Sequence, residues 1–127
     1  MKVKAFLILV AATTLACASG GAGGSGVRRD SMTITADEIA ASHETNAYDA
    51  VSRLRPLFLK SRGRTTLNSG ASDYATVFVD GQAYGDLNSL KGIISQQIKQ
   101  IHYYNGPDAV TKFGMQYGSG VIAVDTR

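Results

Sequence analysis

Apolar residues in this chain recur with the spacing of short helices and short strands. A helix should begin at Thr45 or Asn46, because the apolar residues that follow are three or four positions apart. Asn46 can cap its first turn, and Asp49 suits the positive end of the helix dipole. Pro56 lacks an N–H and crowds the preceding turn, so the helix should end or kink near residues 54–55.

The residues before this helix predict a short strand followed by a capped helical turn. Residues 32–35 favour a strand. Thr35 and Glu38 have the spacing of a capping box, in which each side chain accepts a hydrogen bond from the backbone N–H of the other residue. A short helical turn through residues 39–41 should follow.

Strand patterns dominate the second half of the chain. Residues 75–79 are apolar almost throughout, which predicts a central strand covered on both faces. Asp80 and Gly81 form a tight-turn signal, and residues 82–84 are expected to return as the second arm of a hairpin. Residues 121–125 form the last predicted strand.

Two apolar sets lie between these strands. The first fits one short helix and consists of Leu87, Leu90 and Ile94. The second predicts a strand with three residues in the core, namely Ile98, Ile101 and Tyr103, while His102 and Tyr104 point outward. Residues 105–107 should break that strand before a helical turn over 108–113. Short helices mixed with a small sheet predict the α+β class.

The first sixteen residues have the pattern of an export signal. Lys2 and Lys4 precede an apolar run over residues 5–12, which is too short for a bilayer span of about 20 residues. The residues up to Cys17 resemble a bacterial lipobox, although Thr14 stands where that motif usually has leucine. The resemblance implies a lipid on Cys17 and, with no aspartate after it, sorting to the outer membrane. The alternative is ordinary cleavage nearby, with Cys17 lost or left free.

A glycine-rich stretch separates Cys17 from the rest of the chain. Five of the seven residues at 20–26 are glycine, so residues 17–30 should form a flexible tether. A random coil of this length spans roughly 20 Å. We therefore expect one folded body over residues 31–127, held near a membrane without a fixed orientation.

Charge and cysteine content exclude several classes of protein. The chain has 13 Lys and Arg against 10 Asp and Glu, and removal of Lys2 and Lys4 would leave eleven basic residues. Nucleic-acid binding needs a clustered basic excess, so we expect no nucleic-acid partner. The single cysteine, Cys17, can form neither an internal disulfide nor a cysteine-rich zinc site.

The sequence lacks recognisable catalytic, metal-binding and phosphate-binding motifs. His43 and His102 have no His or Cys at ligand spacing, and no serine occupies a nucleophile elbow. Asp80, Asp86 and Asp108 could supply paired carboxylates, but Asp80 suits a turn and Asp108 suits the first turn of a helix. We therefore expect a protein that is not an enzyme and that needs no cofactor or metal.

Taken together, the spaced motifs of the second half resemble the plug domain of TonB-dependent outer-membrane receptors. The shared elements are V-F-V-D-G at 77–81, I-K-Q-I at 98–101, G-P-D-A at 106–109, F-G at 113–114 and G-V-I-A-V-D-T-R at 120–127. Residues 35–39 and 46–50 resemble the opening segment and first helix of the plug more loosely. The resemblance covers most of residues 31–127.

The resemblance implies a plug-like fold and a place in the cell envelope. In the receptors the plug fills a 22-stranded barrel of the same chain. Here the sequence stops at Arg127, where the plug ends, so we expect a domain without its barrel and no transport activity of its own.

Two loops are the binding surfaces that we expect from this resemblance. Their residues are Tyr84, Asp86 and Leu87 in the first loop and Tyr104, Asn105 and Asp108 in the second. The leading hypothesis is a non-catalytic lipoprotein on the periplasmic side of the outer membrane. It would act by binding or assembly, with a separately encoded receptor barrel or another envelope protein as partner. The alternative is a module that binds a sugar or a siderophore-like molecule, with Tyr84 and Tyr104 as contact residues.

Overall fold

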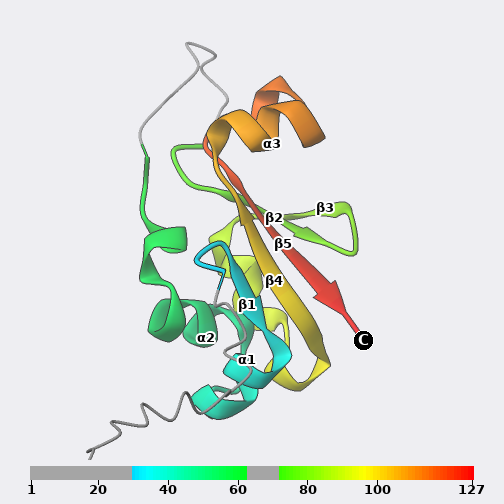
Figure 1. The fold of residues 1–127 in the computed structure, drawn as a ribbon. Coiled ribbons are helices and arrows are strands. Elements are labelled where there is room, and N and C mark those ends of the chain that lie inside the picture. Colours follow the sequence, from blue (N-terminus) through cyan, green and yellow to red (C-terminus); the bar gives the residue numbers. More distant parts are fainter. Residues whose placement is uncertain (1–29, 63–71) are drawn as a thin grey trace, which may run out of the picture.

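The computed structural model describes residues 30–62 and 72–127. The predicted signal peptide, Cys17 and nearly all of the predicted tether lie outside the described residues. Within the described part, a five-stranded sheet has the order β1-β4-β5-β2-β3 (Figure 1). The strands are β1 (Thr33–Thr35), β2 (Thr76–Val79), β3 (Gln82–Gly85), β4 (Ile98–Tyr104) and β5 (Val121–Thr126).

The sheet is mixed, because β2 runs parallel to β5 whereas the other neighbouring strands are antiparallel. The helices are α1 (Ala36–Ser42), α2 (Ala47–Leu54) and α3 (Gly106–Phe113). Short 3-10 turns add η1 (Pro56–Leu59), η2 (Leu87–Gly92), η3 (Ser95–Gln97) and η4 (Met115–Tyr117). The α+β class is therefore confirmed.

Two apolar layers hold the helices against the sheet. The larger core lies between the sheet and α1, α2 and η2, whereas α3 and η4 cover a smaller cluster built on Phe78, Ala109 and Val121. In Figure 1, α1 and α2 lie on one side of the sheet and α3 crosses its upper end. Val77 is fully buried in the larger core and Phe78 is 6% exposed in the smaller one, so β2 is covered on both faces as predicted.

The predicted helix caps are present. Thr35 and Glu38 form the reciprocal capping box at the start of α1. Asn46 caps α2 by accepting a hydrogen bond from the backbone N–H of Asp49 at 2.9 Å, and α2 ends at Leu54 before Pro56. These contacts join residues three positions apart, which is why a linear pattern could predict them.

The predicted role of Ile94 is wrong. Leu90 is fully buried and Ile93 is 7% exposed, whereas Ile94 is 52% exposed. The helical segment η2 is a 3-10 helix that ends at Gly92, and the chain is extended at both isoleucines. Neighbouring side chains of an extended chain point to opposite sides, so only one isoleucine can reach the core.

The boundary predicted for α3 is also corrected. Gly106 and Pro107 belong to the helix, whereas the sequence predicts a start at Asp108. Asn105 is its N-cap and Pro107 lies in the first turn, where a missing backbone N–H costs little because that donor has no partner within the helix. Within the described residues, no helix is long and apolar enough to cross a membrane.

Candidate functional site

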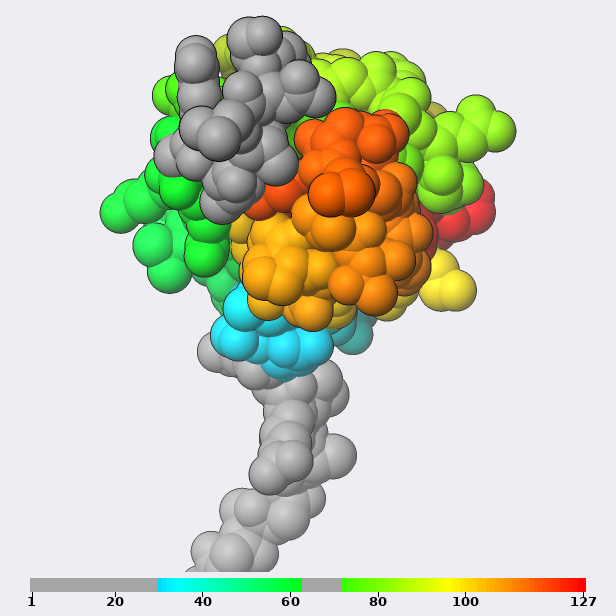
Figure 2. All heavy atoms as spheres, turned by 90° about the horizontal axis from the view of Figure 1, so that it is seen from above, coloured from blue at the N-terminus to red at the C-terminus, as the bar shows by residue number. Residues whose placement is uncertain are grey.

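The two predicted binding loops lie at the same end of the sheet. Tyr104 pairs with Val121, and Val121 in turn pairs with Thr76. One residue further along β2, Val77 pairs with Gly85 of the first loop. We call this region the α3 end, because α3 and the residues after it occupy the middle of its surface (Figure 2, orange).

The first loop exposes one aromatic side chain. Tyr84 is 57% exposed on the edge strand β3, where the pairing register shifts. Tyr84 and Asp86 both line a hollow of about 340 Å³. Asp86 also caps η2 by accepting a hydrogen bond from the backbone N–H of Asn88 at 3.1 Å. Leu87 packs against the larger core and is only partly exposed.

The second loop is occupied by contacts within the domain. The Lys112 ammonium lies 4.3 Å from the centre of the Tyr104 ring and donates a hydrogen bond of 2.5 Å to its hydroxyl. The same ring meets Phe113 edge to face. Asn105 caps α3 by accepting a hydrogen bond from the backbone N–H of Asp108 at 3.1 Å. Tyr104 and Asn105 therefore hold α3 in place, and Asp108 is left exposed at the surface.

The three aspartates considered as catalytic groups, Asp80, Asp86 and Asp108, each make structural contacts in a different part of the fold. Asp80 in the β2–β3 turn accepts hydrogen bonds from the backbone N–H and the hydroxyl of Thr126, at 2.9 and 2.7 Å. These bonds lower the pKa of Asp80 below its usual value. Asp86 and Asp108 act at the starts of η2 and α3. Within the described residues, no group of three or more His, Cys, Asp or Glu could hold a metal ion.

His102 belongs to a hydrogen-bonded chain at the start of β1. The Thr33 hydroxyl donates to Asp30 at 3.1 Å and lies 2.7 Å from Nδ1 of His102. The Thr33 hydroxyl thus bridges Asp30 and Nδ1 of His102. Hydrogen bonds from Met32 and Thr33 lower the pKa of Asp30. This series of hydrogen bonds ties the first described residues to β4.

We expect Asp80→Asn to make the stability of the fold less dependent on pH in the acidic range. The pKa of Asp80 is lower in the folded chain than its usual value of 3.8, so this carboxylate stabilises the fold above that pH. This stabilisation is lost as the pH falls through the lower pKa that Asp80 has in the folded chain. Urea unfolding followed by circular dichroism at pH 6, 4 and 3 should therefore show a smaller loss of stability for Asp80→Asn than for the wild type.

Thr126→Val is the matched variant for this experiment. It removes the hydroxyl donor but keeps the backbone donor to Asp80, so its pH dependence should lie between those of the wild type and Asp80→Asn. An unchanged pH dependence in Asp80→Asn would contradict this explanation.

A pocket that the sequence does not predict lies at the opposite end of the sheet. This pocket has a volume of about 570 Å³ and lies between α1, the segment before η3 and the end of β5. Its apolar wall includes Ile39 and Ile94, and its polar wall includes His43, Gln96 and Arg127. The signal in the sequence was the Ile93-Ile94 pair, since one of two neighbouring apolar residues in an extended segment points away from the core.

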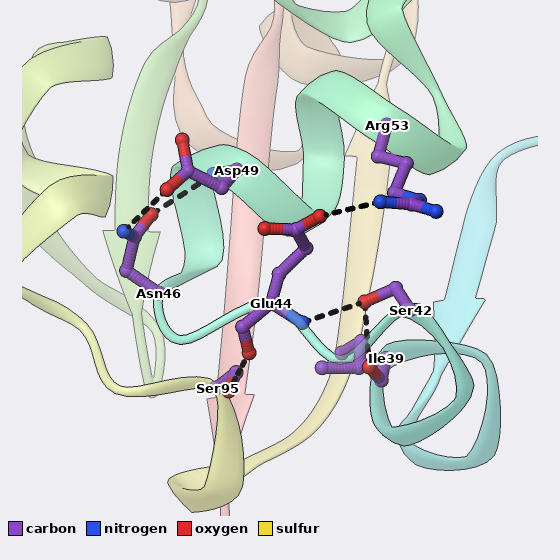
Figure 3. A network of polar contacts seen from close by, with 7 residues as sticks. All are labelled: Ile39, Ser42, Glu44, Asn46, Asp49, Arg53 and Ser95. Atoms are coloured by element: carbon purple, nitrogen blue, oxygen red, sulfur yellow. Dashed lines mark hydrogen bonds and ion pairs between the residues drawn. The ribbon is translucent and has the colours of Figure 1, made fainter.

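Polar contacts hold the rim of this pocket in shape, as Figure 3 shows. The hydroxyl of Ser95 donates to the backbone carbonyl of Glu44 at 2.5 Å, and the Ser95 N–H donates to the carbonyl of Thr45 at 3.0 Å. The Glu44 carboxylate accepts a hydrogen bond from Arg53 at 3.0 Å. These bonds join the loop between α1 and α2 to η3 and to α2 at the rim of the pocket.

No protein-family model, curated protein or solved structure was found to match this chain.

Proposed function

We propose that this chain is a non-catalytic lipoprotein of the cell envelope that acts by docking to another envelope protein. A separately encoded outer-membrane receptor barrel is the first candidate partner. The proposal rests on the resemblance of the sequence to receptor plug domains and to lipoprotein signals. It places the protein at the outer membrane, facing the periplasm, with a lipid on Cys17.

The segments that resemble plug-domain motifs lie next to one another in the structure, and this observation carries the proposal. The V-F-V-D-G segment lies on β2 and its turn, I-K-Q-I lies on β4, and the closing segment lies on β5 between these two strands. The G-P-D-A and F-G segments begin and end α3, which packs on the same strands. Motifs spread over about fifty residues thus meet in one structural unit, as a shared fold would require.

The α3 end supplies the docking surface of this proposal. Three large, exposed side chains come from segments at this end: Tyr74, Tyr84 and Met115, exposed by 48%, 57% and 77%. Tyr74 precedes β2, Tyr84 lies on β3, and Met115 begins η4. Exposed tyrosine and methionine are enriched in protein interfaces.

The decisive experiment is a pull-down of the tagged chain from its native membranes in mild detergent. The wild type should fractionate with membranes and bring a barrel protein with it, whereas Cys17→Ser should leave the membrane fraction. A Tyr84→Ala, Met115→Ala double variant should stay membrane-bound but lose the partner by more than about tenfold, because aromatic anchors carry much of an interface's binding energy.

Ile94→Ala is the matched control, because Ile94 is 52% exposed but lines the pocket at the opposite end of the sheet. This variant should keep the partner. A wild-type chain that is membrane-bound but has no partner would overturn the docking function, and Cys17→Ser remaining with membranes would overturn the lipid anchor.

Small-ligand binding is the second candidate function. Of the two tyrosines predicted as ligand contacts, Tyr84 lines the hollow of about 340 Å³, and Tyr104 is packed against Lys112 and Phe113. The observation that favours ligand binding is the larger pocket at the other end of the sheet.

A further inference from the structure

We propose that the pocket between α1 and the segment before η3 binds a medium-chain aliphatic carboxylate. This site lies at the end of the sheet opposite Tyr84 and Met115, so the proposal does not depend on docking at the α3 end. The pocket volume of about 570 Å³ is within the range of about 300–1,000 Å³ that is typical of small-molecule sites.

The apolar wall suits an alkyl chain. Ile94 is 52% exposed toward this pocket, and Ile39 forms part of the wall with only 2% of its surface exposed. Ile94 cannot turn inward, because Ile93 already occupies the core position beside Leu90. A β-bridge between Asn46 and Ile94, with the hydrogen bond from Ala47 N–H to the Ile93 carbonyl, fixes this orientation. The Ile94 side chain is thus held where it can contact a molecule bound in the pocket.

The polar wall suits an anion. Arg127 and Gln96 provide hydrogen-bond donors from two separate segments of the wall. Within the described residues no ion-pair partner is found for Arg127, and its backbone is held by a hydrogen bond of 2.9 Å to the Gln97 carbonyl. Glu44, the acidic residue of the wall, is paired with Arg53 at 3.0 Å (Figure 3). A carboxylate can take two parallel hydrogen bonds from a guanidinium, which fits this arrangement.

The test is a titration of the purified full chain carrying Cys17→Ser with sodium octanoate, followed by amide NMR. Octanoate should shift the signals of residues 39–45 and 94–96 saturably, and acetate and octan-1-ol should bind at least about tenfold more weakly, because each lacks one of the two recognised groups. Arg127→Gln should weaken octanoate binding about tenfold and leave octan-1-ol unaffected.

Ile94→Ala should weaken octanoate binding, whereas Leu57→Ala, which also truncates an exposed apolar residue, should not. Non-saturable or scattered shifts would overturn the proposal, as would equal binding of octan-1-ol or an unchanged affinity in Arg127→Gln. None of these outcomes changes the expected pull-down of an envelope partner, so failure of this site is distinguishable from failure of the docking function.

Discussion

Ile93→Ala is expected to destabilise the domain by about 2–4 kcal/mol, because truncation of a buried isoleucine removes apolar contacts and leaves a cavity. Ile93 is 7% exposed and packs in the larger core with Leu90 and Val51. Domains of this size unfold with about 5–15 kcal/mol, so the loss is a large fraction of the total. Urea unfolding followed by circular dichroism should show a lower midpoint with an unchanged slope.

Ile94→Ala is the control for this prediction, because the same change is made one residue further along. Ile94 is 52% exposed, so its truncation should change the free energy of unfolding by no more than about 0.5 kcal/mol. If the two variants lost equal stability, or if Ile94→Ala lost more, the assignment of Ile93 to the core would be wrong.

Gly106→Ala is expected to cost about 2–3 kcal/mol for a different reason. A Cβ atom on Gly106 would lie 2.4 Å from the backbone carbonyl oxygen of Gly118. Backbone cannot rotate aside as a flexible side chain can, so α3 must move away from the turn that leads into β5. The small cluster of Phe78, Ala109 and Val121 would then be disrupted. Thermal unfolding should show a midpoint lowered by roughly 10–20 °C.

Gly92→Ala is the matched control for Gly106→Ala. A Cβ atom on Gly92 would meet nothing within 4 Å. This variant should therefore be neutral or more stable by up to about 1 kcal/mol, because alanine restricts the unfolded chain more than glycine does. A Gly106→Ala protein as stable as the wild type would show that α3 is free to shift.

The close approach at Gly106 bears on the resemblance to plug domains. Gly106 belongs to the G-P-D-A segment, and the carbonyl it faces precedes the closing G-V-I segment. Gly106 of one motif thus meets Gly118, two residues before the other motif, at a distance that leaves no room for a side chain on Gly106. This contact is a physical reason for glycine at that position, independent of any resemblance.

Local features of the fold were predictable because they depend on residues close together in the chain. The capping box at Thr35 and Glu38, the cap at Asn46 and the tight turn at Asp80 and Gly81 are of this kind. Asp80 and Gly81 both have positive φ, which Asp tolerates and Gly adopts freely. The strand at β5 was predictable from its nearly continuous apolar run.

The surroundings of the candidate binding residues could not be predicted from the sequence. Exposed Tyr84 and Asp86 do share a hollow, but Leu87 is a packing residue and Tyr104 is covered by α3. These packing contacts could not be predicted, because the spacing of residues along a strand or turn does not show which helix will pack over it. The pocket beside Ile94 was missed because its walls come from α1, the segment before η3 and the end of β5, which are distant in sequence.

The amino-acid pattern was enough to predict the α+β class, the caps of α1 and α2, the turn at Asp80 and the alternation that places Ile101 and Tyr103 in the core. The strand order, in which β5 lies between β4 and β2, and the burial of Ile93 rather than Ile94 depend on how distant segments pack. Hydrogen bonds and side-chain periodicity within one element depend on neighbouring residues, whereas strand order and pocket shape arise only when the free energy of packing distant segments selects one arrangement.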